Sequence, residues 1–177
     1  MPGAEPAAPL ILTAALPHDL HSWATALRDR YFAPDRNYLQ AHVTLFHALL
    51  PSCEAELAGV LARLAKENAP VPARLEGVMS LGRGTALKLS SPAMLALRDE
   101  IAEHFHGSLS AQDQHRPRLH VTVQNKVTAA EAKQVQAELA AQVISRDFAF
   151  RGFALYRYRG GPWECVRDWS FRGQKRG

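Results

Sequence analysis

Cysteine is scarce in this sequence, and no long apolar run occurs. Only Cys53 and Cys165 are present among the 177 residues, far apart and outside any Cys-x-x-Cys pattern. This excludes a disulfide-stapled miniprotein and a zinc site built on cysteines, and it favours a reduced, cytoplasmic location. No apolar stretch approaches the roughly 20 residues that a membrane-spanning helix needs, so we expect no membrane segment.

The N-terminus also lacks the pattern of a secretory signal. Residues 1–9 contain no Lys or Arg, and Pro17 ends the apolar run 10–16. The run is too short for a signal peptide and predicts a first β-strand instead. Hydrophobic residues make up 47% of the chain and charged residues 21%, which is typical of a soluble globular domain and excludes disorder for most of it.

The chain has little excess charge, but that excess is unevenly distributed. The formal net charge is +4, and residues 151–177 alone contain seven Lys or Arg against two acidic residues. A basic segment favours an anionic partner such as a phosphate or a nucleic acid. Residues 173–177 are expected to form a basic tail, in which Lys175 and Arg176 are solvated charges.

The predicted elements occur in the same order twice. Residues 8–84 and 85–172 each read as strand, helix, polar loop, strand, helix and strand, with Pro17 and Pro92 at equivalent helix starts. Ser91 before Pro92, and Thr128 with Glu131, are further helix-start signals. A duplicated βαβαβ unit predicts a single α+β domain with two pseudo-symmetric lobes. We expect each lobe to be a small, mostly antiparallel sheet with helices on its outer face, and the lobes to frame a central cleft.

Two short strands carry the same polar pattern at equivalent positions of this repeat. They contain His42-x-Thr44 and His120-x-Thr122, with apolar residues between and after the polar ones. Residues i and i+2 of a strand share a face. We therefore expect each His and Thr pair to face the cleft while the alternate residues enter the core.

Histidine and threonine suit acid–base chemistry on a phosphodiester. An imidazole titrates near pH ~6.5, so one of two facing histidines can accept a proton while the other donates one. Threonine hydroxyls can donate hydrogen bonds to phosphate oxygens in the transition state. This chemistry needs no cofactor, and neither histidine has a carboxylate or thiol nearby on its face to complete a zinc site.

With its two His-x-Thr motifs, their separation and the duplicated layout, the sequence resembles the 2H phosphoesterase superfamily, also called the 2′-5′ RNA ligase and cyclic phosphodiesterase family. The resemblance covers residues 8–172. It implies metal-independent action on 2′,3′-cyclic or 2′-5′ phosphodiester bonds of RNA ends or small nucleotides. It also implies acid–base roles for His42 and His120, and phosphate contacts for Thr44 and Thr122. In the bacterial RNA ligase-like subgroup an arginine commonly follows the second motif, where this chain has Gln124-Asn125-Lys126.

Strand alternation predicts further substrate-binding residues beside the motifs. These are Gln40 and Phe46 around the first motif, and Arg118, Gln124 and Lys126 around the second. Arg118 could bind a second phosphate, and Phe46 could stack on a base. The aromatic residues of the last predicted hairpin, Tyr156, Tyr158 and Trp163, are alternative stacking platforms.

Other functions stay open at this point. The same cleft could belong to a module that binds RNA ends or nucleotides without cutting them, and a metal-dependent hydrolase is a weaker alternative. His47 and His115 lie near the motifs and could line the cleft, although surface or structural roles are favoured for both. We expect a monomer.

Overall fold

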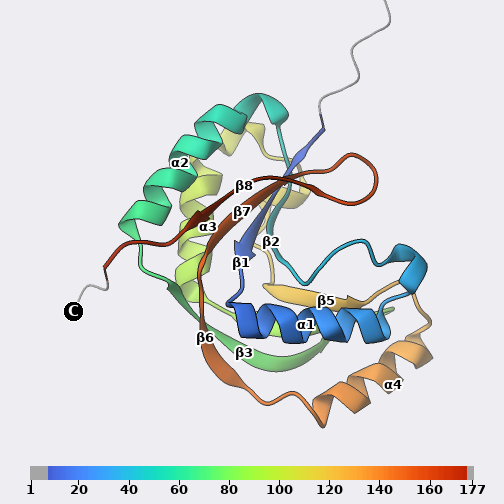
Figure 1. The fold of residues 1–177 in the computed structure, drawn as a ribbon. Helices are drawn as coiled ribbons and strands as arrows, with labels where there is room; N and C mark the ends of the chain where they lie inside the picture. Colours follow the sequence, from blue (N-terminus) through green and yellow to red (C-terminus); the bar gives the residue numbers. More distant parts are fainter. Residues whose placement is uncertain (1–7, 175–177) are drawn as a thin grey trace, which may run out of the picture.

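A computed structural model describes residues 8–174 and arranges them as two four-stranded antiparallel sheets with flanking helices (Figure 1). The first sheet has the strand order β2-β1-β7-β8 and the second has the order β5-β4-β3-β6. The strands are β1 Leu10–Ala15, β2 Val43–Leu49, β3 Val71–Ser80, β4 Thr85–Ser90, β5 His120–Gln124, β6 Arg146–Phe150, β7 Gly152–Arg157 and β8 Glu164–Ser170. The helices are α1 His18–Tyr31, α2 Glu54–Glu67, α3 Pro92–His104 and α4 Ala129–Ala140. The predicted α+β class is confirmed.

Two of the helix starts follow directly from local sequence. The Ser91 hydroxyl accepts a hydrogen bond from the Met94 amide, and Pro92 occupies the first turn of α3. The Thr128 hydroxyl accepts from the Glu131 amide at the start of α4. Each hydroxyl satisfies an amide that has no partner inside the helix, as the sequence predicts.

The two sheets do not follow the two predicted halves. Strand β3, from the first half, pairs with β4 in the second sheet, while β7 and β8, from the second half, complete the first sheet. The cause is the tight connection between β3 and β4, closed by a hydrogen bond from the Leu81 amide to the Gly84 oxygen. A turn this short can only join antiparallel neighbours.

The chain crosses back between the sheets near residue 151. A single strand is predicted over 148–158, but it divides into β6, which pairs with β3, and β7, which pairs with β1. A Cβ on Gly152 would lie 2.0 Å from the Trp169 oxygen, so the close approach of β7 and β8 there requires glycine. Each sheet therefore contains strands from both halves.

The helices cover both sheets and complete one shared core. Helix α2 packs on β7 and β8, and α4 packs on β3 and β4, while α1 contacts β5 and α3 contacts β3. Phe46, Phe150 and Phe153 are the largest fully buried side chains of a cluster that joins both sheets. Within residues 8–174, no helix combines the length and apolar character needed to cross a membrane.

The predicted basic tail is described only at its beginning. The Gly173 amide donates to the Asn68 oxygen, and the Arg172 amide donates to the Ala65 oxygen, which ties this segment to the end of α2. Lys175 and Arg176 lie outside the described residues.

Candidate active site

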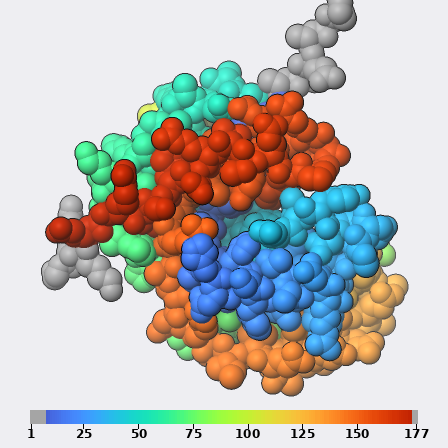
Figure 2. All heavy atoms as spheres, viewed as in Figure 1, coloured from blue at the N-terminus to red at the C-terminus, as the bar shows by residue number. Residues whose placement is uncertain are grey.

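Both His-x-Thr motifs line one open cleft of about 630 Å³ between the sheets. His42 directly precedes β2, which carries Thr44, whereas His120 and Thr122 lie on β5. The cleft wall also includes Leu81 from the end of β3 and Trp163 from the β7–β8 connection. Figure 2 shows the β7–β8 hairpin, in red, beside the blue-to-cyan segment that leads to the first motif. The expectation that the two motifs share a cleft is met by this arrangement.

The two motif histidines are oriented in the same way. His42 Nδ1 lies 2.8 Å from the Gln40 main-chain oxygen, and His120 Nδ1 lies 2.6 Å from the Arg118 main-chain oxygen. A carbonyl oxygen only accepts hydrogen bonds, so Nδ1 carries the proton in both rings. In each neutral ring Nε2 is then the nitrogen that can accept a proton from a bound molecule.

A β-bulge follows each motif and reverses the alternation of faces. In β2, Thr44 pairs with Thr13 and Phe46 pairs with Leu12, which leaves the residue after Thr44 without a partner. In β5 the same shift follows Thr122. A bulge places one extra residue in a strand and moves the next side chain to the opposite face.

The bulges overturn two predicted cleft positions. Phe46 is fully buried, and Gln124 is buried with its Oε1 accepting a 2.9 Å hydrogen bond from the Thr85 hydroxyl. The prediction that both side chains face the cleft is therefore wrong, because it assumed unbroken alternation. The bulge in β2 instead brings His47 to the cleft, where the sequence favours a surface or structural role for this residue.

The remaining predicted binding residues do not all lie in the cleft. Arg118 and Trp163 line the cleft. The Gln40 side chain is exposed and lies outside the cleft wall. The main-chain oxygen of Gln40 accepts the hydrogen bond that orients His42. Lys126 lines a neighbouring cavity. His115, for which a surface or structural role is predicted, also lines the cleft.

Among the aromatic residues of the last hairpin, Trp163 lies closest to the motifs. Its ring centroid is 4.6 Å from that of His42, with the rings tilted by 58°. Tyr156 packs behind it, at 5.6 Å between ring centroids, and Tyr158 is exposed outside the cleft wall. Trp163 is thus an aromatic wall next to the first histidine.

The surroundings of His42 keep its imidazole neutral. Burial lowers the pKa of His42 to about 4, although the hydrogen bond to the Gln40 carbonyl opposes this. Electrostatic repulsion from Arg28, and from His120 and His47 when these are protonated, lowers this pKa further. Near pH 7 the Nε2 lone pair of His42 is consequently free to take up a proton.

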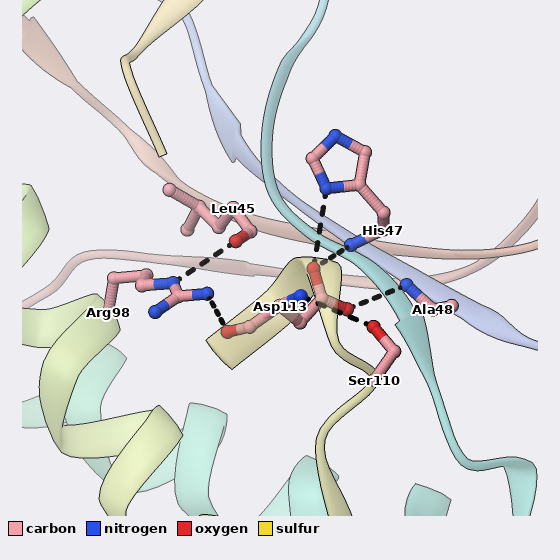
Figure 3. Close-up of polar contacts among 6 residues, drawn as sticks. All are labelled: Leu45, His47, Ala48, Arg98, Ser110 and Asp113. Atoms are coloured by element: carbon pink, nitrogen blue, oxygen red, sulfur yellow. Dashed lines mark hydrogen bonds and ion pairs between the residues drawn. The ribbon is translucent and has the colours of Figure 1, made fainter. Parts of the chain in front are cut away.

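A buried carboxylate joins the first motif strand to the loop before the second motif (Figure 3). Asp113 is 1% exposed and accepts hydrogen bonds from the His47 and Ala48 amides at 2.8 and 2.9 Å. It also lies 3.3 Å from His47 Nδ1. Burial raises the pKa of Asp113, but these hydrogen bonds and the His47 charge outweigh it and lower the pKa below its usual value. The carboxylate therefore stays ionised and fixes the backbone around His47.

Two buried arginines connect the halves reciprocally. Arg28 on α1 donates to the Thr122 oxygen of the second motif at 2.8 Å and to the oxygen of Leu39, before the first motif, at 3.1 Å. Arg98 on α3 donates to the Leu45 oxygen after the first motif at 3.2 Å and to the oxygen of Asp113, before the second motif. Each arginine thus links the loop of its own half to the motif strand of the other.

The cleft is positively charged. Arg98, Arg116 and Arg118 line it, and Asp113 is the one carboxylate among the described lining residues. Arg116 is paired with Asp99, while Arg118 adds a charge at the cleft edge. Such a surface attracts an anion such as a phosphodiester. No group of three or more His, Cys, Asp or Glu side chains within residues 8–174 is arranged to hold a metal ion.

Sequence comparison assigns most of the chain to a known family. Residues 16–162 match the 2′-5′ RNA ligase superfamily. The chain belongs to this superfamily. The resemblance drawn from the two His-x-Thr motifs is confirmed by the match. No curated protein matches the sequence.

Solved structures agree with the superfamily assignment at the level of the fold. The crystal structure of TT0787 of Thermus thermophilus is 18% identical, with a TM-score of 0.62 over 94% of this chain and 99% of that one. E. coli LigT complexed with 3′-AMP is 16% identical, with a TM-score of 0.63 over 95% of this chain and 99% of LigT. At this identity the likeness shows that the superfamily fold is shared.

Proposed function

We propose that this protein is a metal-independent phosphoesterase that acts on 2′,3′-cyclic phosphate or 2′-5′ phosphodiester bonds of RNA ends or small nucleotides. The observation that carries the proposal is the matched orientation of His42 and His120, whose Nδ1 atoms both bond the carbonyl two residues earlier. A protein that only bound nucleotides would have no need for two equally presented imidazoles. The E. coli LigT structures hold 3′-AMP, ATP and NADP+, so nucleotides are the ligands to test first.

The reaction needs one proton acceptor and one proton donor. The low pKa of His42 favours this residue as the acceptor, which takes the proton of the attacking water or hydroxyl through Nε2. His120 then donates a proton to the leaving oxygen, and the two protonation states exchange over the full cycle. Each role contributes roughly 10²–10⁴ in rate. Thr44 and Thr122 donate hydrogen bonds to the phosphate oxygens as negative charge increases.

The test is a substrate panel with matched variants. Nucleoside 2′,3′-cyclic phosphates and 2′-5′ dinucleotides are incubated with the wild type, His42→Ala and His120→Ala, in EDTA. We expect turnover by the wild type with a bell-shaped pH profile, and loss of at least about 10²-fold in each variant. Full activity in both variants would contradict the mechanism. Binding without any product would support a binding module, and activity lost in EDTA and restored by zinc would support a metal-dependent hydrolase.

A further inference from the structure

A second cavity adjoins the cleft beyond the end of β3. It has a volume of about 280 Å³ and is lined by Leu81, Arg83, Asn125 and Lys126. Leu81 also lines the cleft, so the two spaces are neighbours. The walls of this cavity come from the β3–β4 turn and from the segment that directly follows the second motif strand.

These two segments hold each other in place. The Val127 amide donates to the Arg83 oxygen at 3.1 Å, and Arg83 Nε donates to the Val127 oxygen at 3.0 Å. A Cβ on Gly84 would lie 2.3 Å from the Gln124 oxygen, so the two backbones are in close contact. The Arg83 guanidinium is consequently anchored through one nitrogen, and its two terminal nitrogens stay available to a ligand.

The cavity has an uncompensated positive charge. Within residues 8–174, neither Arg83 nor Lys126 is paired with a carboxylate. Another cavity that adjoins the cleft, beside Arg118, differs because its Lys88 is paired with Glu76 at 3.5 Å. An anion therefore gains more from the cavity at Arg83 and Lys126.

Lys126 occupies a backbone conformation that does not favour lysine. Its φ of 54° lies in the left-handed region, and it is the one non-glycine residue with positive φ in the described part of the chain. A side chain there costs roughly 1–2 kcal/mol, and such strained positions cluster at ligand-binding sites. Glycine would fit this backbone with less strain, yet the chain has a cation there.

The position of Lys126 relative to the second motif defines the ligand. Lys126 follows Thr122 by four residues and lies two residues beyond the end of β5, so at most about 13 Å of chain separates them. Lys126 is not among the residues that line the cleft; it lines the neighbouring cavity, which shares Leu81 with the cleft. A phosphate held between His42 and His120 and a further phosphate of the same RNA strand can therefore occupy the two spaces together. We propose that Arg83 and Lys126 form a subsite for a backbone phosphate of a single-stranded RNA whose end carries the scissile phosphodiester. This inference rests on the proposed function and narrows its substrate to RNA ends over free mononucleotides.

The experiment compares two substrates that differ only in chain length. A nucleoside 2′,3′-cyclic phosphate and a short single-stranded RNA ending in the same cyclic phosphate are assayed with the wild type, Lys126→Gly and Arg83→Gln. We expect the ratio of kcat/KM for RNA to that for the mononucleotide to fall about three- to five-fold in each variant, the size of an exposed ion pair. The salt dependence of kcat/KM for RNA should become shallower by about 0.7 in log–log slope for each cation removed.

Two controls make the result specific. Lys126→Arg keeps the charge and should retain the wild-type ratio, and Arg63→Gln removes an exposed arginine of α2 and should change neither substrate. An unchanged ratio and salt slope in both Lys126→Gly and Arg83→Gln would overturn the subsite. Failure of the wild type to process either substrate would instead overturn the proposed function, so the two failures are distinguishable.

Discussion

Arg28 donates a 2.8 Å hydrogen bond to the main-chain oxygen of Thr122, a residue 94 positions later in the chain. The same guanidinium holds the oxygen of Leu39, before the first motif. One buried side chain thus fixes the backbone of both halves of the candidate active site, and its charge lowers the pKa of His42.

Replacing Arg28 should therefore alter both geometry and protonation. In Arg28→Met, the oxygens of Thr122 and Leu39 lose their donors, and we expect a loss of stability of about 3 kcal/mol. We also expect the pKa of His42 to rise, because a nearby positive charge is removed. Urea unfolding measures the first effect, and NMR titration of the His42 ring measures the second.

Arg28→Lys provides the matched control for that prediction. Lysine keeps the charge but cannot reproduce the guanidinium fork, so kcat should fall while the pKa of His42 stays near its wild-type value. Equal His42 titration curves for the wild type and Arg28→Met would contradict an electrostatic role for Arg28.

Asp113 should contribute much more to stability than an exposed carboxylate does. Asp113→Asn removes the charge that the His47 and Ala48 amides bond, and we expect a loss of about 2 kcal/mol of unfolding free energy. Asp99→Asn is the matched control, because Asp99 pairs with Arg116 at the surface and should cost less than about 1 kcal/mol. Comparable losses in the two variants would show that the burial of Asp113 adds nothing to the free energy of unfolding.

His42 should destabilise the fold in acid. Its folded pKa is about 4 against an ordinary value of 6.5, so the unfolded chain binds more protons between these values. The contribution of His42 to the free energy of unfolding is therefore complete above pH 6.5, and about 3 kcal/mol of it is lost as the pH falls to 4. Urea unfolding of the wild type and His42→Gln at pH 7 and pH 4.5 measures the difference.

The pH range of that comparison avoids the titration of Asp113. The pKa of Asp113 is below its ordinary value of 3.8 in the folded protein, so its stabilising contribution is complete above pH 4.5 and disappears only in stronger acid. A pH dependence of equal size in His42→Gln and the wild type would count against a lowered pKa of His42.

An activated leaving group should separate the roles of the two histidines. A nitrophenyl phosphodiester releases nitrophenolate, which leaves without needing a proton. If His120 is the donor, His120→Ala should recover about 10²-fold or more of its lost activity on this substrate, whereas His42→Ala should not. The reverse pattern would exchange the two roles, and steady-state absorbance assays are sufficient to show it.

Much of the architecture is readable from the sequence because it depends on local patterns. The Ser91 and Thr128 caps and the paired His-x-Thr strands follow from neighbouring residues. The bulges after Thr44 and Thr122 are not readable, because they depend on how β1 and β4 pair with these strands. Phe46 and Gln124 were misplaced for this reason.

The helical spacing of the sequence indicates that Arg28 and Arg98 are buried, although the alternation of strand residues does not. Arg28 lies four residues after the buried Ala24, and Arg98 lies four residues after the buried Met94. A charged residue at a core position of an amphipathic helix requires buried partners. Those partners are main-chain oxygens far along the chain, which no local pattern specifies.

The exchange of strands between the halves has a consequence for the order of folding. Strand β1 is flanked by β2 and by β7, and Leu10 pairs with Arg157 near the other end of the chain. During synthesis the first sheet has only its two N-terminal strands until residues 152–170 emerge, and such long-range pairings slow folding. Trp163 arrives with that hairpin, so the wall beside His42 is among the last parts of the cleft to form.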